Sequence, residues 1–211
     1  MNFDLICVVP DKDTQAALEA LLNHRCKALG LRRIQSKVIP HPQRDPGCYQ
    51  DGSAFLGELL SGNQAKGLLA LDQAWEGNPH SSALETESEI RKKMTGLEGR
   101  AEVVVIEPEL EAWVWSASKH VPLVLGWEEG WGELRRWLGS RGLWSPGRSK
   151  PEQPKEAVEA ALYQKRIPRS SSIYRNLAKK VSVHGCEDAS FGRLTNILKA
   201  WFGVGSAGLR V

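Results

Sequence analysis

The chain has 211 residues, of which 41% are hydrophobic and 25% charged, and its formal net charge is +3. This composition is ordinary for a soluble globular protein with a sizeable core, and the mildly basic balance permits a nucleic-acid partner without requiring one. No apolar run approaches the ~20 residues of a membrane span. The four scattered cysteines and the lack of a secretory signal exclude a disulfide framework and favour a reduced, cytoplasmic protein.

The first half of the chain alternates apolar strands with amphipathic helices. Residues 3–9 predict a first strand, which Pro10 ends, and a capped helix follows over residues 14–29. Residues 33–39 alternate in the manner of a second strand, and the proline-rich stretch 40–47 predicts a loop. The remaining elements of this half are a helix over 53–60, a strand over 67–71, a helix over 81–95 and a fourth strand over 103–106.

The second half has helical patterns and no convincing strand. Just beyond the fourth strand, the spacing of Leu110, Trp113 and Val114 predicts that the chain enters a helix. Further helices are expected over 132–138, 155–163, 171–181 and 189–202. Strands that are apolar throughout and alternate with helices are typical of a parallel sheet. We therefore expect an α/β fold, with a mainly parallel four-stranded sheet and helices on both faces in residues 1–120, and a helical C-terminal extension, residues 121–211, packed on it.

Acidic residues follow the predicted strands at the points where the strands end. They are Asp11 and Asp13 after the first strand, Asp45 with His41 and Arg44 after the second, Asp72 and Glu76 after the third, and Glu107, Glu109 and Glu111 after the fourth. Adjacent parallel strands lie about 4.8 Å apart, so acids at their carboxyl ends can share one cation. Oxygen ligands without paired Cys or His suit Mg²⁺ or Mn²⁺, the ions of phosphoryl transfer and phosphodiester cleavage. The expected metal ligands are Asp72, Glu76, Glu107 and Glu111, with Asp11 or Asp13 as a base or a further ligand.

Structural roles compete with this interpretation for most of these acids. Asp11 and Asp13 are also what a helix N-terminus alone would produce, and Glu76 could equally lie in a solvated loop. Glu107 and Glu111 share a face if the following helix begins early, and acids at a helix start also favour its dipole.

Basic residues mark a candidate nucleic-acid surface. Arg44 lies in the proline-rich loop, where it could instead do no more than pair with Asp45, and His41 of that loop is expected at the surface. Lys150 and Arg169 belong to a basic stretch that a phosphate backbone would attract, although interleaved glutamates make solvated helix faces the alternative. The tryptophans crowded between residues 113 and 144 are expected to pack helices together, although an exposed one could stack a base.

The pattern of these strand-end acids resembles that of the TOPRIM-like fold, a small parallel α/β domain of primases, topoisomerases and overcoming-lysogenisation-defect nucleases. That family places a Glu after its first strand and an Asp-x-Asp after its third, and it binds Mg²⁺ for phosphodiester chemistry. Here Asp11 or Asp13 would fill the first position and Asp72 the second, while Ala74 breaks the Asp-x-Asp pair and leaves Glu76 as a substitute. Several TOPRIM-like defence families also carry a Glu-x-Trp and a Pro-Lys-Glu, which this chain has as Glu111-Ala112-Trp113 and Pro154-Lys155-Glu156.

Longer motifs spread over nearly the whole chain resemble a small protein of bacterial methylation-associated anti-phage defence systems. They are HPQRDPGC from residue 41, IEPELEAWVWS from 106, KPEQPKEA from 150, PRSSSIY from 168, CEDASF from 186 and LKAWF from 198. The resemblance implies a place in a multigene defence operon beside a modification methyltransferase and effectors. The expected partners are other subunits of that operon, with DNA and a second copy of the chain as further candidates, and no membrane.

The expected function is therefore a component of anti-phage defence with a divalent-metal-dependent nuclease or phosphoryl-transfer site, in which Lys155 would stabilise developing phosphate charge. The rival function is a non-catalytic sensor or adaptor that binds a partner protein, a nucleotide or DNA through a degenerate TOPRIM-like pocket. The third possible function is that of a purely structural scaffold.

Overall fold

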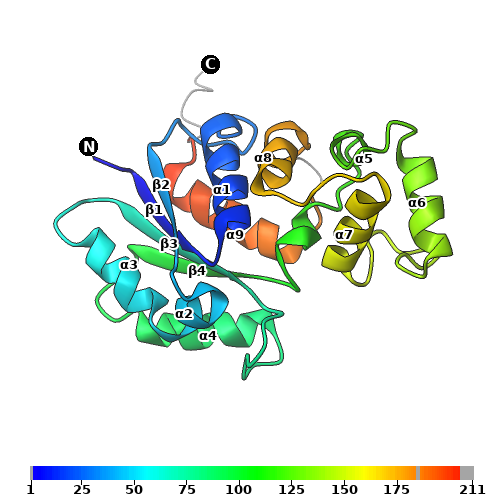
Figure 1. The fold of residues 1–211 in the computed structure, drawn as a ribbon. Coiled ribbons are helices and arrows are strands. Elements are labelled where there is room, and N and C mark those ends of the chain that lie inside the picture. The colour runs from blue at the N-terminus through cyan, green and yellow to red at the C-terminus, as the bar shows by residue number, and fades with distance from the viewer. Residues whose placement is uncertain (1, 184–185, 205–211) are drawn as a thin grey trace, which may run out of the picture.

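A four-stranded parallel sheet in the order β2-β1-β3-β4 lies at the centre of the protein (Figure 1). The computed structural model describes residues 2–183 and 186–204. The strands are β1 (Leu5–Val9), β2 (Ser36–Pro40), β3 (Lys66–Asp72) and β4 (Ala101–Ile106). The predicted fold class is confirmed, because the sheet is parallel throughout, helices cover both its faces, and helices make up the C-terminal part.

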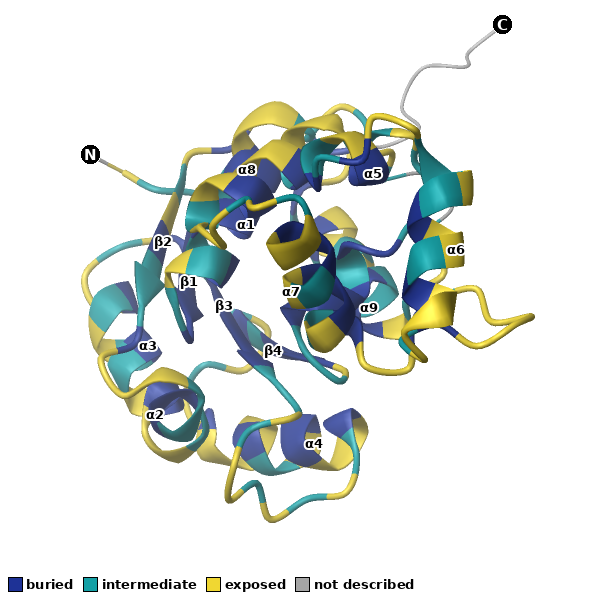
Figure 2. Ribbon diagram, turned by 45° about the vertical axis from the view of Figure 1, so that its right-hand side comes forward, coloured by how far each residue is buried: buried dark blue, intermediate teal, exposed yellow. Residues whose placement is uncertain are grey.

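The central strands are apolar because both of their faces are covered. Alternate residues of β1 enter opposite cores, with Leu5 and Cys7 on one face and Ile6 and Val8 on the other. Figure 2 shows the buried sheet between helices whose outer surfaces are exposed. The helices of one face are α2 (Arg44–Gln50), α3 (Gly52–Leu60) and α4 (Ala83–Lys93), and those of the other are α1 (Lys12–His24) and α9 (Ala189–Phe202).

A second group of helices lies beyond the carboxyl end of β4 (Figure 1). Trp115, Trp127 and Trp144 are buried in the core of this group, which confirms their expected packing role. Helix α8 packs along α1 and joins the group to the sheet. Among the described residues, no helix is both long and apolar enough to cross a bilayer. The elements of the group are η1 (Leu110–Trp113), α5 (His120–Val124), α6 (Trp131–Ser140), α7 (Pro154–Gln164) and α8 (Ser171–Lys180).

The predicted loop over residues 40–47 is wrong, because α2 begins inside it. Pro46 lies in the first turn of α2, where a helix does not need the backbone N–H that proline lacks. The surface position expected for His41 is also wrong, since this residue is 5% exposed and its Nε2 lies 3.3 Å from Asp51 Oδ1. Gly47 makes room for it, because a Cβ at that position would lie 2.2 Å from His41 Nδ1.

The helix predicted after β4 does not begin early enough to include Glu107. The chain instead crosses Pro108 and forms the short 3-10 helix η1 from Leu110. Glu107 remains exposed on the connecting loop, whereas Glu111 is buried within η1. These two glutamates therefore do not share a helix face.

Candidate acidic site at the carboxyl edge of the sheet

Asp72 is the last residue of β3, and its position in the sheet is fixed by pairing with Ile106 of β4. The residue is half-buried, but its Oδ1 atom is fully covered and has no hydrogen-bond partner. Burial raises the pKa of the Asp72 carboxyl well above its ordinary value, and the charges of neighbouring acids, chiefly Asp45, raise it further. An ionised carboxylate oxygen without a donor is costly to bury, so the protonated acid or a bound cation is favoured at this position.

Asp45 reaches the end of β3 from the first turn of α2. Its Oδ1 accepts a hydrogen bond from the backbone N–H of Asp72 at 2.8 Å. Burial raises the pKa of Asp45, the bond from Asp72 opposes that shift, and the charge of Asp11 adds to it. Asp45 therefore contacts Asp72 rather than forming the local pair with Arg44 considered from the sequence, and Arg44 is exposed.

Asp11 and Asp13 flank the start of α1. Asp11 is the N-cap, with Oδ1 accepting a hydrogen bond from the backbone N–H of Thr14 at 2.8 Å, so the capping role is confirmed for this residue. Its charge nevertheless raises the pKa of both Asp45 and Asp72. Asp13 accepts a hydrogen bond from Ser171 Oγ at 2.7 Å and lies 3.2 Å from Arg169 Nη2.

Glu111 is only 2% exposed and is held by two side chains of the C-terminal half. Arg169 Nη2 donates to its Oε1 at 3.0 Å, and the Tyr174 hydroxyl donates to the same oxygen. Burial, followed by the charge of Glu111, raises the pKa of Tyr174, which therefore remains a neutral donor. Burial would lower the pKa of Arg169, but Tyr174 and the acids around it raise the pKa overall.

Arg169 is the centre of an ion-pair network. Besides Glu111 and Asp13, its guanidinium binds Glu159 Oε1 at 2.9 Å, and its Nε donates to Tyr174 Oη at 2.9 Å. Its donors are thus shared among carboxylates and a phenol of the same chain. A phosphate backbone, which the sequence predicted as a partner of Arg169, would have to compete with them.

Lys155 brings a partly exposed positive charge to the same edge. It lies in the first turn of α7, and its Nζ is 3.7 Å from Glu109 Oε2. Burial raises the pKa of Glu109, the charge of Glu111 adds to this effect, and Lys155 opposes it. The Lys155 side chain is 42% exposed, so its ammonium is available to a ligand from solvent.

Other predicted site residues lie elsewhere. Glu76 and Glu107 are exposed on the loops after β3 and β4. Lys150, predicted to contact nucleic acid, donates instead to the carbonyl of Ala112 at 2.8 Å and to Asp188 Oδ2 at 3.0 Å. Lys150 therefore fastens η1 to the start of α9.

We call Asp11, Asp45, Asp72, Glu109 and Glu111 the acidic site. Within residues 2–183 and 186–204, no three Asp, Glu, His or Cys side chains are arranged around one point as a finished set of metal ligands. The chemistry of the donors still fits Mg²⁺ or Mn²⁺, because Asp72 has a buried oxygen without a partner and lies close enough to four other acids for their charges to raise its pKa. Mg²⁺ often takes only one or two carboxylates and keeps water as its other ligands. Asp72 and Asp45 are the residues that would hold such an ion.

Comparison with models of protein families, with curated proteins and with solved structures found no match to this chain.

Proposed function

We propose that this chain is a cytoplasmic component of a bacterial anti-phage defence system and that its acidic site cleaves phosphodiester bonds with the help of Mg²⁺ or Mn²⁺. The observation that carries the proposal is the buried, unpartnered Oδ1 of Asp72 among carboxylates that raise its pKa. Lys155 and Arg169 offset the charges of Glu109 and Glu111, but neither forms an ion pair with Asp72, and a cation bound there would relieve the remaining repulsion. Structural salt bridges do not account for this atom, whereas a metal ligand would.

The residues of the site would have separate roles. A bound divalent cation would supply Lewis-acid stabilisation to a phosphate oxygen. Asp72 and Asp45 would hold it, and the negative charge of Asp11 would strengthen its binding. Lys155, the exposed cation beside Glu109, would neutralise charge that develops on the phosphate. Arg169 and Tyr174 would keep Glu111 in one orientation.

The first test measures metal binding. Isothermal titration of the purified chain with Mn²⁺ should give saturable binding, and Asp72→Asn should weaken it by more than about 100-fold. Glu107→Gln is the matched control, because it removes an exposed carboxylate from the loop after β4 and should leave the affinity unchanged. Equal Mn²⁺ affinity in the wild type and in Asp72→Asn would refute the metal site.

The second test measures cleavage. Plasmid or phage DNA incubated with the chain and Mn²⁺ should be cut, and Lys155→Ala should slow the reaction about 100-fold while Mn²⁺ still binds. Lys119→Ala, an exposed lysine before α5, serves as the control. Metal binding without any cleavage would remove the nuclease function and retain the site.

A non-catalytic sensor or adaptor is the second candidate. The observation in its favour is that several acids already have structural partners, since Asp11 caps α1 and Arg169 neutralises Asp13 and Glu111. Phage-infection assays separate the two functions. An Asp72→Asn strain that keeps full protection would establish the adaptor, whereas loss of protection with a folded variant supports the enzyme.

A further inference from the structure

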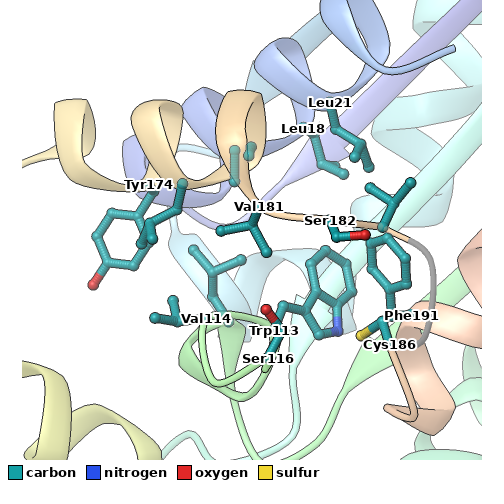
Figure 3. A pocket seen from close by; sticks show the side chains of 15 residues that line it. Leu18, Leu21, Trp113, Val114, Ser116, Tyr174, Val181, Ser182, Cys186 and Phe191 are labelled. Carbon is teal, nitrogen blue, oxygen red and sulfur yellow. The ribbon is translucent and has the colours of Figure 1, made fainter. Parts of the chain in front are cut away.

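An apolar pocket lies beside the acidic site, between α1, α8, η1 and the start of α9 (Figure 3). It contains about 590 Å³ of space that protein atoms do not fill, part of which is open to solvent. Leu18 and Leu21 come from α1, Trp113 from η1 and Phe191 from α9, while Val181 follows α8. Elements far apart in the sequence thus build one hollow.

The lining of the pocket defines the chemistry of what can enter it. None of the fifteen described residues that line it has a charged side chain. The indole Nε1 of Trp113 already donates to Ser190 Oγ at 2.7 Å, so this polar atom is used inside the protein. An ion would lose hydration here and meet no opposite charge among the described lining residues, whereas an uncharged apolar molecule would lose little.

Three aromatic rings contribute to a wall that is otherwise mainly aliphatic. Trp113 and Phe191 meet edge to face with their ring centroids 5.5 Å apart, and the ring of Tyr174 is a further lining surface. Rings arranged in this way offer both faces and edges to another ring. A flat aromatic molecule in the pocket can therefore pack against these rings as well as against the aliphatic side chains.

One wall of the pocket is shared with the acidic site. The ring of Tyr174 lines the pocket, while its hydroxyl points away from it and donates to Glu111 (Figure 3). The short helix η1 also contributes to both sites. Leu110 and Trp113 line the pocket, whereas Glu111, which lies between them in the sequence, belongs to the acidic site. A molecule in the pocket would thus touch the residues that orient Glu111 without touching the acids themselves.

We propose that this pocket binds a small, uncharged aromatic molecule, and that its occupancy is sensed by Tyr174. Binding of this molecule in the pocket is independent of the proposed metal site. Only an effect of the bound molecule on catalysis would rest on the proposed function. Because Tyr174 and Leu110 separate the two sites, the ligand is a regulator rather than part of a substrate.

Indole is a suitable probe, and its binding can be measured without metal. Isothermal titration should show one saturable site, and Val181→Phe, which fills the pocket, should reduce the affinity at least tenfold. Val204→Phe is the matched control, since Val204 is 64% exposed outside the pocket, and it should bind indole as the wild type does. Absence of saturable binding, or unchanged affinity in Val181→Phe, would overturn the proposal.

A second measurement locates the bound probe in the wild-type chain and does not depend on how Val181→Phe folds. The chain has three tyrosines, Tyr49, Tyr163 and Tyr174, so ring resonances of ¹³C-labelled tyrosine can be assigned with single Phe variants. Indole should shift the Tyr174 resonance and leave those of Tyr49 and the exposed Tyr163 in place. A shift confined to Tyr49 or Tyr163 would place indole elsewhere and refute the pocket. Failure of Mn²⁺ binding would leave both indole results unaffected.

Discussion

Glu87 of α4 and Arg193 of α9 meet beyond the edge of the sheet, with 2.8 Å between Oε1 and Nε. The two helices cover opposite faces, so the ion pair passes around the edge strand β4. Both partners also bind the backbone of Val105, whose N–H donates to Glu87 Oε1 at 3.0 Å and whose carbonyl accepts from Arg193 Nη2 at 2.9 Å. Side chains thus occupy hydrogen-bonding groups that a further strand would otherwise use.

This pair should contribute strongly to stability. The Glu87 side chain is 1% exposed, so Arg193→Met leaves a buried carboxylate with Arg91 as its remaining cationic partner. We expect a loss of about 3 kcal/mol in the free energy of unfolding, measured by urea denaturation. Arg136→Met, which removes a 75% exposed partner of Glu133, should cost less than about 1 kcal/mol. Similar costs for the two variants would contradict the role of the edge pair.

Asp72 should make the metal-free protein less stable as pH rises. Its pKa is raised in the folded state, so the folded chain holds a proton that the unfolded chain has released. The stabilisation from this proton is complete below the ordinary aspartate pKa and is lost as pH rises through the folded pKa. Asp72→Asn should therefore match the wild type near pH 4 and exceed its unfolding free energy by about 1–3 kcal/mol at pH 8. Urea denaturation across this range tests the difference, and parallel curves for the two proteins would show that Asp72 does not titrate in this way.

Arg169 and Glu111 should behave as a coupled pair. Arg169→Met leaves the nearly buried Glu111 without its cation and should cost about 3 kcal/mol of unfolding free energy. The same change made in a Glu111→Gln background should cost less, because the uncompensated charge is already gone. A double-mutant cycle by thermal or urea denaturation measures this coupling, and additive effects would show that the two residues act independently. The unfolding free energy of Arg169→Lys should fall between those of the wild type and Arg169→Met, since an ammonium cannot bridge the same set of oxygens.

Periodicity and strand-end position were sufficient to predict the sheet and part of the acidic site. The apolar runs of β1, β3 and β4 identify a parallel sheet, and the carboxyl ends of such strands meet at one edge. That argument selected Asp72 and Asp11, which the structure brings close enough for the charge of Asp11 to raise the pKa of Asp72. It also selected Glu76 and Glu107, which have the same sequence context but lie exposed on loops. Sequence distance from a strand end does not determine which way a loop side chain points.

Sequence reasoning does not select Asp45 as a site residue, for a local reason. The three prolines of residues 40–47 predict a loop, although a proline is compatible with the first turn of a helix, where Pro46 lies. The position of Asp45 beyond the second strand marks it as a strand-end acid, but the loop interpretation favours a local pair with Arg44 over a role in the site.

The partners of buried acids depend on long-range contacts that periodicity does not encode. Arg169 is 58 residues from Glu111, and Arg193 is 106 residues from Glu87. From the sequence alone, Arg169 belongs to a basic stretch and Arg193 to an amphipathic helix, and polar side chains in such segments are usually solvated. Only the packing of α8 and α9 against the first half of the chain determines which acid each arginine meets.

The place of α9 over the sheet has a consequence for synthesis on the ribosome. Leu194 and Leu198 of this helix pack in the same core as Leu5 and Cys7 of β1, although nearly the whole chain lies between them. A nascent chain that has completed all four strands therefore still shows part of one apolar sheet face to its surroundings. Until α9 emerges and docks, that face is the surface through which a chaperone would recognise the unfinished protein.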